Sequence, residues 1–487
     1  GKSGKKQRAP VDHAATLFSR ATAEIIDLLC EGEINGLVNG SKSIFFDEVR
    51  VQNDDNSFNF EGVTIQEKVG TPSQAAVTGF DAVLSTVAIN QEVTDISSPQ
   101  FTVTETSIDA IRVIVQFPSL MIQNTSNGDL LPHTVGIKIE VTENDAGGVF
   151  TELINEEITG KTKSAYQEAY RIDLSPYTFA ANDYPLIFKV SRTTPEAVET
   201  TTQDQIFVDS YIEIQEQKFE YPDSAYVAIT VDSELFGGKI PKRSYEIEGL
   251  KIQHPSNYDP DTRVYTGIWD GTFLEGYCNN PAWVMYDMLT NSRYGLGDDI
   301  DTSQVDKAAL YQIGIYCDEL VDDGRGGQEP RFTLNAVITQ RKEAYTVLNA
   351  IASVFRGMAF WSAGGVSFSN DQPKDAVRVV TNANVKDGDF TYSGVGLKAR
   401  HSAVLVTWND PLDFYRQQIE VVEDSALIER FGWRQIELVA FGTTSRAQAI
   451  RMGKWLLQAE ATETETVTYE AGWDHADTTP GQIIQIS

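Results

Sequence analysis

The chain has 487 residues, 41% of them hydrophobic, which is enough for about three globular domains at the usual ~150 residues each. Its formal net charge of -31, from 39 basic and 70 acidic residues, argues against binding of duplex DNA through neutralisation of phosphates. Three widely separated cysteines argue against a disulfide framework. Since the sequence shows neither a membrane-spanning segment nor a signal-peptide core, we expect a soluble protein synthesised in a cytoplasm.

The first residues, GKSGKKQRAP, form a basic segment without acidic residues. Its glycines and proline predict a mobile arm that contacts an acidic neighbour through Lys2, Lys5, Lys6 and Arg8. A helix is predicted from Asp12 to Glu31, because apolar residues recur at helical spacing. These residues are Leu17, Ala21, Ile25, Leu28 and Leu29. Packing of this helix on its own domain and docking on a neighbouring subunit are both open. Residues 1–33 are therefore predicted as an arm and a helix.

The next part of the chain is dominated by segments in which apolar residues alternate with others. These run from Ile111 to Phe117, Val135 to Val141, Leu186 to Val190 and Ile206 to Ile214. Alternation of this kind buries one face of a strand, and short strands between turns predict an immunoglobulin-like or fibronectin-like β-sandwich at 85–217. A strand at 227–231 is interpreted as a return to a β domain that begins near 34, so 34–84 and 218–279 form one split domain.

The segment from Pro255 to Gly297 is rich in aromatic residues and glycines and leads into a helix that begins at Asn280 and Pro281. Its aromatic residues need burial, and its glycines permit tight turns. The aromatic residues are Trp269, Phe273, Trp283, Tyr286 and Tyr294. Anchoring of this segment on its own core is favoured over a ligand site.

The region 280–375 is predicted as an α+β domain. Ser303 and Asp306 match a capping box before one helix, and a second helix is expected from Ala344 to Phe355. A hairpin follows, with an Ala-Gly-Gly turn. The last region, 376–487, is predicted as a β domain with one helix at 445–460, and we expect the natural chain to continue beyond 487.

Acidic residues gather between 298 and 323, and a solvated face is the default interpretation. Asp298, Asp299, Asp301, Asp322 and Asp323 are the main candidates. The stretch DGRGG that ends this region lacks the Lys-Ser or Lys-Thr of a phosphate-binding loop, so a tight turn is expected.

No motif for catalysis or metal binding is present. The sequence contains no GxSxG, HExxH or GxxxxGK[ST] motif, and its five histidines are scattered singly. We therefore predict no catalytic residue, no metal, no cofactor and no enzymatic activity.

Several long motifs resemble the tail tip protein J family (host specificity protein J) of lambda-like siphophages. They are GIWDGTF at 267–273, RYGLG at 293–297, EPRFTLNAVITQRKEAYTVL at 329–348, VEDSALIERFG at 422–432 and AFGTTSRAQAIRMGKWLL at 440–457. Weaker similarity, including CEGEINGLVNGSKSI at 30–44, reaches the N-terminus. The resemblance covers nearly the whole chain, and the motifs occur in the same order.

This resemblance implies a structural protein of the virion tail tip: a mainly β, multidomain tail hub with an α+β insertion, with barrel-like hub domains and an inserted β-sandwich. The family forms a homotrimer that joins the tail tube to a central fibre and encloses a channel for DNA. Its partners are the distal tail protein, other tail tip proteins and the tape measure protein. Host receptor binding is expected only from segments beyond residue 487, and DNA is expected to pass without specific binding.

Two site hypotheses follow. The motif residues Trp269, Asp270, Gly271, Phe273, Arg293 and Tyr294 are candidates for a domain or subunit junction. The acidic residues named above are candidates for a channel lining that repels phosphates, or for an ordinary surface. Two other functions remain open: a tail-associated peptidoglycan hydrolase and a surface carbohydrate-binding β-sandwich protein.

Overall fold

The computed structural model describes residues 11–487 except 13, 18–21, 144–148, 178, 180–182, 217–219, 233–235, 237, 238, 341, 395 and 397–399. It divides into two compact units, one made of the chain up to 30 and 36–247, and the other of 31–35 and 248–487. Strands outnumber helices in both units, which confirms the prediction of a mainly β, multidomain fold.

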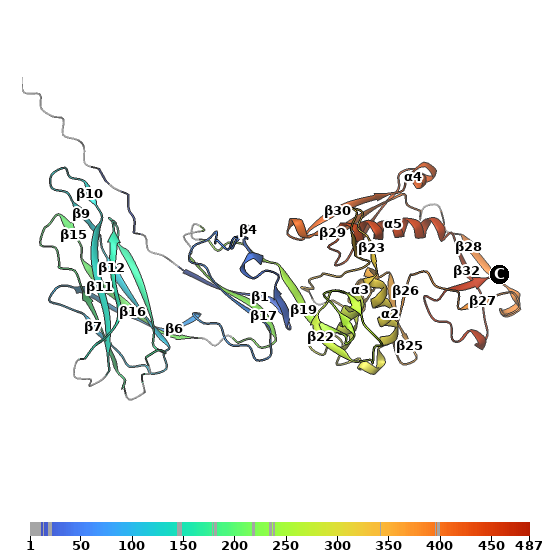
Figure 1. The fold of residues 1–487 in the computed structure, drawn as a ribbon, viewed down its shortest axis with the longest axis horizontal. Helices are drawn as coiled ribbons and strands as arrows, with labels where there is room; N and C mark the ends of the chain where they lie inside the picture. The colour runs from blue at the N-terminus through green and yellow to red at the C-terminus, as the bar shows by residue number, and fades with distance from the viewer. Residues whose placement is uncertain are drawn as a thin grey trace, which may run out of the picture. The chain divides into compact units, whose positions relative to one another are not determined.

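The first unit contains a β-sandwich of two four-stranded antiparallel sheets, as predicted (Figure 1). The sheet of order β12-β11-β14-β7 consists of β7 (Gln100–Val103), β11 (His133–Thr142), β12 (Thr151–Gly160) and β14 (Leu186–Arg192). The sheet of order β13-β8-β16-β6 consists of β6 (Asp81–Val93), β8 (Ala110–Phe117), β13 (Tyr166–Asp173) and β16 (Ile206–Glu216). A small sheet joins β9 (Met121–Gln123), β10 (Leu130–Leu131) and β15 (Thr202–Gln203).

The apolar residues that alternate in the sequence form the sandwich core, except in part of β16. Val113, Val115 and Phe117 on β8 are fully buried in the same core as β11 and β14. In β16 the register shifts between Val208 and Ser210, which reverses the alternation. Tyr211 therefore enters the core instead of the predicted Ile212, which is only half-buried.

Two three-stranded sheets make up the rest of the first unit. One has the order β1-β17-β5, from β1 (Thr22–Glu31), β5 (Thr64–Val69) and β17 (Ser224–Asp232). The other has the order β18-β3-β4, from β3 (Ile44–Phe46), β4 (Val49–Arg50) and β18 (Arg243–Tyr245). Because β17 lies between β1 and β5, segments on either side of the sandwich in sequence share one sheet.

The predicted helix from Asp12 to Glu31 is wrong, since residues 22–31 form strand β1. Ile25 and Leu29 are four residues apart, a spacing that fits both one helical turn and two strand repeats. Both contact the core beside β17, whereas Leu28, assigned to the same helical face, is 67% exposed. Pairing of β1 with β17 therefore selects the strand over the helix. Ala21 lies outside the described residues.

A sheet of order β2-β19-β22 lies mostly in the second unit, where β19 and β22 share a core with three helices. These elements are β2 (Ile34–Leu37), β19 (Ile247–Pro255), β22 (Phe273–Tyr277), α1 (Pro281–Thr290), α2 (Lys307–Asp318) and α3 (Ala344–Val354). Short pairs join β20 (Tyr258–Asp259) to β21 (Val264–Tyr265) and β23 (Leu320–Asp322) to β24 (Gln328–Pro330). As predicted, Asn280 caps α1 by accepting from the Ala282 N–H at 2.9 Å.

The capping box predicted before α2, formed by Ser303 and Asp306, is wrong. Asp306 alone caps α2 by accepting from Ala309 N. The capping box belongs instead to a 3-10 turn at Thr302–Gln304, where Asp301 and Gln304 exchange bonds. Carboxylates occupy both cap positions, and Ser303 donates its hydroxyl to Asp301.

The predicted hairpin is confirmed as β25 (Gly357–Ser362) and β26 (Gly365–Asn370). Its two-residue turn has positive φ at Ala363 (51°) and Gly364 (84°), as a primed hairpin turn requires.

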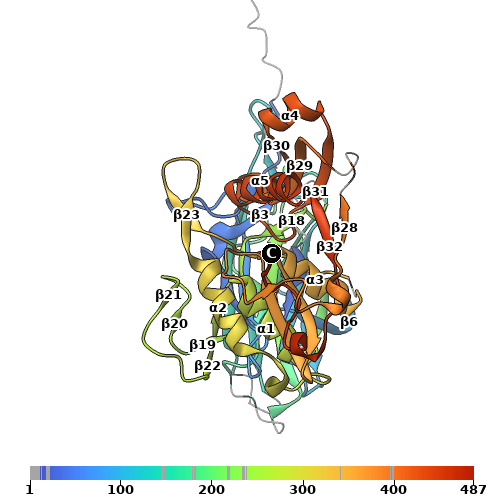
Figure 2. The ribbon, with the colours of Figure 1, turned by 90° about the vertical axis from the view of Figure 1, so that its right-hand side faces the viewer.

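The last part contains a sheet of order β30-β29-β31 and a long helix, α5 (Arg446–Thr462), that lies on one face of it (Figure 1, Figure 2). The strands are β29 (Ala403–Asp410), β30 (Arg416–Glu423) and β31 (Gln435–Val439), with α4 (Ser425–Phe431) between β30 and β31. Two further pairs are β27 (Arg378–Val380) with β33 (Ile484–Ile486), and β28 (Thr391–Gly394) with β32 (Glu465–Thr468).

Candidate functional site

The GIWDGTF motif at 267–273 forms a fixed loop between β21 and β22. Gly267 and Gly271 have φ of 67° and 88°, which side chains other than glycine rarely adopt. One carboxylate oxygen of Asp270 accepts from the Thr272 N–H at 2.9 Å and from the Thr272 hydroxyl at 2.6 Å. These bonds from Thr272 lower the pKa of Asp270. The loop is therefore held by its own side chains.

The motif aromatics point into the second unit and pack on its helices. Trp269 stacks on Tyr311 of α2 at 4.9 Å between ring centroids and donates its indole N–H to the Thr272 carbonyl at 2.6 Å. Phe273 stacks on Tyr286 of α1 at 4.2 Å. Trp269 and Phe273 therefore anchor the loop to its own core.

One residue of this loop is presented outward. Ile268, next to the anchored Trp269, is 98% exposed. Its side chain makes no contribution to the core on which Trp269 and Phe273 pack.

The second motif, with Arg293 and Tyr294, follows α1 in the chain and contacts the same helix. The Tyr294 hydroxyl donates to the Asp287 carboxylate of α1 at 2.6 Å, one residue beyond Tyr286. Arg293 forms an ion pair with Glu31 at 2.5 Å. Both motifs therefore pack on α1, which the sequence did not indicate.

Beneath the loop lies a buried polar network that the sequence did not reveal. Asp318 accepts from Arg263 at 2.6 Å, from Asn280 at 2.7 Å and from the Tyr265 hydroxyl at 3.1 Å. Burial raises the pKa of Asp318, and the Arg263 guanidinium opposes this effect. Asp318 lies within the acidic stretch 298–323, for which a solvated face was expected, but it is buried and paired inside the second unit.

The acidic candidates form two separate groups. Asp298, Asp299 and Asp301 precede α2, whereas Asp322 and Asp323 follow it. α2 has 12 residues, which at 1.5 Å per residue separates its ends by about 18 Å. All five are exposed except Asp323, which is half-buried and accepts N–H bonds from Arg325 and Gly327. These bonds form the expected tight turn of DGRGG and lower the pKa of Asp323.

Lys2, Lys5, Lys6 and Arg8 lie outside the described residues. Within the described parts of the chain, no group of three or more His, Cys, Asp or Glu side chains is arranged to hold a metal ion. No helix in those parts is long and apolar enough to cross a membrane.

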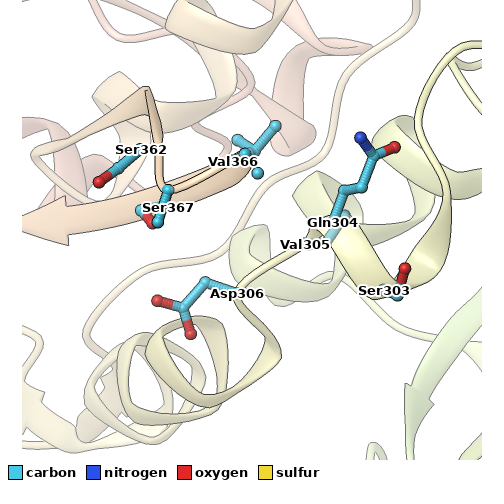
Figure 3. A pocket seen from close by; sticks show the side chains of 10 residues that line it. Ser303, Gln304, Val305, Asp306, Ser362, Val366 and Ser367 are labelled. Carbon is cyan, nitrogen blue, oxygen red and sulfur yellow. The ribbon is translucent and has the colours of Figure 1, made fainter.

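A cavity of about 450 Å³ opens between the start of α2 and the β25–β26 hairpin. Figure 3 shows Ser362 and Ser367 on the hairpin side and Asp306 at the helix start. Asp306 accepts the Ala309 N–H at 3.0 Å as the cap of α2.

Comparison with known proteins gives consistent matches. Residues 83–217 match the family model described as the FNIII-A domain of tip attachment protein J, and residues 343–487 match a family of putative phage tail proteins. Tip attachment protein J of Escherichia phage SECphi27 is 36% identical over 99% of this chain and 40% of its own length. Tip attachment protein J of Escherichia phage SECphi4 is 33% identical over 99% of this chain and 42% of its own length.

Solved structures add no functional argument. A carbohydrate-binding module of Cel9A from Ruminococcus flavefaciens FD-1 aligns with 28% of this chain and 99% of its own at a TM-score of 0.20 and 13% identity. The chain spans about two fifths of the length of the curated relatives that it matches. Both relatives match 99% of this chain, and the sandwich coincides with residues 83–217, which match the FNIII-A domain of tip attachment protein J. The chain therefore belongs to the tip attachment protein J family of phage tail proteins.

Proposed function

We propose that this chain is the structural hub of a siphophage tail tip. Three copies join the tail tube to the central fibre and enclose the channel through which DNA is ejected during host entry. The observation that carries the proposal is the 36% identity to a tip attachment protein J over 99% of the chain. Cyclic assembly suits a β-rich chain, because closure covers strand edges that would otherwise pair with other proteins.

The partners in this proposal are the distal tail protein, other tail tip proteins and the tape measure protein. Receptor contact belongs to segments beyond residue 487. Engagement of a receptor would favour an open state of the hub, and inverting a roughly 1:99 equilibrium needs about 5.5 kcal/mol of differential binding.

Within this hub we propose the division into a split β domain (34–84 and 218–279), the inserted sandwich (85–217), an α+β domain (280–375) and a final β domain (376–487). The pairing of β17 with β5 supports the split domain, because these strands come from its two parts. The N-terminal segment 1–33 contributes the basic arm, which contacts an acidic neighbour in the assembly.

We assign the exposed Asp298, Asp299, Asp301 and Asp322, with Asp323, to the channel wall, where carboxylates repel passing phosphates. Replacing the three residues before α2 by asparagine should slow DNA ejection at low salt and have less effect at high salt, since salt screens the repulsion. If the variant and the wild-type protein eject DNA at equal rates at every salt concentration, these residues lie away from the channel.

We assign the GIWDGTF loop, with Arg293 and Tyr294, to a junction between domains or subunits. The support is the full exposure of Ile268 on a loop whose neighbours Trp269 and Phe273 are anchored inside. Ile268→Ser should leave folding unchanged and reduce assembly of tails, measured by counting intact tails in electron micrographs.

The hub acts by shape and performs no reaction of its own. Light scattering on the purified chain should give the mass of a trimer, and antibody labelling of virions should mark the tail tip. A monomer, or label along the tube, would contradict the hub. A zymogram with clearing of peptidoglycan would instead favour a hydrolase.

A further inference from the structure

Two motifs that the proposed function leaves unexplained contact each other in the second unit. They are EPRFTLN at 329–335, in the proposed α+β domain, and AFGTTSRAQAIRMGKWLL at 440–457, in the proposed final β domain. Each domain has a hydrophobic core of its own, with Phe332 in the first and Met452 in the second. The contact between the two motifs is therefore a boundary between two cores, and it is called here the joint.

The helix α5 presents a different side to each domain. One side lies on the β30-β29-β31 sheet (Figure 2) and contributes to its core. The core residues of this side are Ala449, Met452 and Leu457. The other side carries residues that recur every three or four positions: Ser445, Gln448, Arg451 and Trp455. Residues at this spacing share one side of a helix, so they form a single strip, which contacts the α+β domain.

Gln448 is the central residue of the strip. It is 2% exposed, its side-chain oxygen accepts the Thr333 N–H at 2.9 Å, and its side-chain N–H donates to the Thr333 carbonyl at 3.0 Å. A neighbouring β-strand would make the same pair of bonds to Thr333. Residues 332–339 belong to no sheet, so the side chain of Gln448 replaces a strand partner at this position.

Arg451 continues the polar contact along α5. Its guanidinium donates to the Arg331 carbonyl at 2.9 Å and lies 2.7 Å from a carboxylate oxygen of Glu329. The same carboxylate accepts the Ser445 hydroxyl at 2.7 Å. Glu329 therefore binds two residues of the strip, and the joint is held by hydrogen bonds and an ion pair.

The far end of the joint contains a cation that is disfavoured by burial. Arg356, between α3 and β25, lies over the rings of Phe332 and Trp455, at 5.3 and 5.2 Å from their centroids. It donates to the Arg451 carbonyl at 3.2 Å. Burial lowers the pKa of Arg356 to about 10, so its charged form is less stable in the closed joint than in water.

The N–H groups of residues 332–335 alternate between the two domains. Phe332 and Leu334 donate to the Cys317 and Asn279 carbonyls of their own domain, at 3.0 and 2.9 Å. Thr333 donates to Gln448, and Asn335 donates to the Gly442 carbonyl at 2.8 Å. The list of N–H groups that depend on the joint is therefore Thr333 and Asn335.

The contacts of the joint suit opening without unfolding. Water replaces hydrogen bonds and an ion pair when such a contact opens, whereas the two cores keep their apolar burial. Polar interfaces between domains commonly permit relative motion. We propose that the joint is a releasable contact, at which the final β domain separates from the α+β domain while both stay folded. The inference rests on the proposed division into domains, and it concerns a single chain, whether or not the chain forms a trimer.

The first experiment uses the double variant Gln448→Met with Arg451→Met, which keeps side-chain size and removes the polar bonds. Hydrogen exchange of the full chain, resolved to single residues, should be about 10-fold faster or more at Thr333 and Asn335, as loss of several hydrogen bonds predicts. Exchange at Phe332 and Leu334 should stay at the wild-type rate. The matched control is Lys454→Met with Gln458→Met, at exposed positions of α5, and it should exchange as the wild type does.

Three outcomes would overturn the proposal. Unchanged exchange at Thr333 and Asn335 in the double variant would show that these side chains do not hold the joint. Equally faster exchange at Phe332, Leu334 and strand β29 would show that the two domains unfold together. The same acceleration in the control would show that any change on α5 has this effect.

A second measurement uses the wild-type chain and does not depend on folding of a variant. In low concentrations of urea, exchange at Thr333 and Asn335 should depend less steeply on urea than exchange in β29, because opening of the joint exposes less surface than unfolding of a core. Equal dependence on urea would overturn the releasable joint. Either result leaves the trimer and the labelling of the tail tip as separate tests of the hub.

Discussion

The β-sandwich and the β30-β29-β31 sheet use their apolar side chains in different ways. In the sandwich, two sheets bury their inner faces against each other, and edge strand β12 exposes Glu152, Glu156 and Glu157. In the C-terminal sheet, α5 buries one face, and the opposite face, called here the outer face, leaves Ile419, Val421 and Val439 in solvent. Exposed charge near an edge discourages pairing with other chains. The outer face also carries Glu423 and Glu437, which pair with Ala403 and Leu405. The sandwich therefore covers its apolar faces within one chain, whereas the C-terminal sheet leaves apolar and acidic side chains together in solvent.

The largest expected difference between the two regions comes from truncation of their apolar residues. Phe188 is fully buried and stacks on Phe101 at 5.3 Å. Phe188→Ala should lower the free energy of unfolding of the sandwich by about 3–5 kcal/mol. Val421→Ala, on the outer face, should change the stability of an isolated subunit by less than about 0.5 kcal/mol.

The distribution of tryptophan makes this measurement specific. All 7 tryptophans follow residue 268, so their fluorescence reports on the second unit and not on the sandwich. In urea, Phe188→Ala should shift the transition seen by circular dichroism and leave the fluorescence transition in place. A large effect of Val421→Ala on the fluorescence transition would show that the outer face packs within its own chain.

A second prediction concerns the inner face of the C-terminal sheet, which packs closely against α5. A Cβ atom on Gly453 of α5 would lie 2.8 Å from a methyl group of Val422 and 3.0 Å from one of Val406. Overpacking costs about 1–3 kcal/mol, and the higher helix propensity of alanine returns about 1 kcal/mol. Gly453→Ala should therefore destabilise the second unit by about 1 kcal/mol, as measured by tryptophan fluorescence in urea.

The control for this change is Gln458→Ala, at an exposed position of the same helix, which should have no measurable destabilising effect. If Gly453→Ala stabilises the second unit, α5 can move away from the sheet, and the contrast between inner and outer faces is smaller than described.

A third prediction uses the pH dependence of stability to test whether Asp287, which lies beside the candidate junction, is buried. Burial raises the pKa of Asp287, so the folded state holds this proton more strongly than the unfolded state. The associated stability is present below about pH 4, near the unfolded pKa, and is lost as pH rises through the folded pKa. Asp287→Asn still offers an oxygen to Tyr294 and does not titrate.

The stability of the wild-type chain relative to Asp287→Asn should therefore fall as pH rises from about 4 to 7. Unfolding of both proteins, monitored by fluorescence at several pH values, measures this difference. The contribution of the other acidic residues is the same in both proteins and is removed by the subtraction. A difference that stays constant over this range would show that Asp287 is solvated in the folded chain.

The sequence predicted the self-contained region better than the rest, for a physical reason. In β8 and β11 every second residue is buried in one core, so period-two alternation is visible locally. In β1 the apolar residues suit both a helix and a strand, and only pairing with β17, about 200 residues away, decides between them. A contact of that sequence separation leaves no local pattern.

The candidate junction shows the same limit. The motif indicated that Trp269 and Phe273 are anchors, since large aromatics among glycines need a core. Their partners Tyr311 and Tyr286 come from two helices, and the charge count placed Asp318 on a solvated face although it pairs with Arg263 inside. Residue type predicts that a side chain needs burial or pairing, and the fold determines which residues it packs against or pairs with.

The smallest expected effect on stability belongs to the tip of the β29–β30 hairpin, residues 411–415, where backbone strain can be tested. Tyr415 has φ of 55°, which costs a bulky residue about 1–2 kcal/mol, whereas asparagine tolerates this conformation. In Tyr415→Asn the relief of strain offsets the loss of ring contacts, so the stability of the isolated subunit should rise by less than about 1 kcal/mol or stay unchanged. A fall in stability of more than about 1 kcal/mol would show that the ring packs within its own chain, and the tip would then belong with the sandwich as a self-contained region.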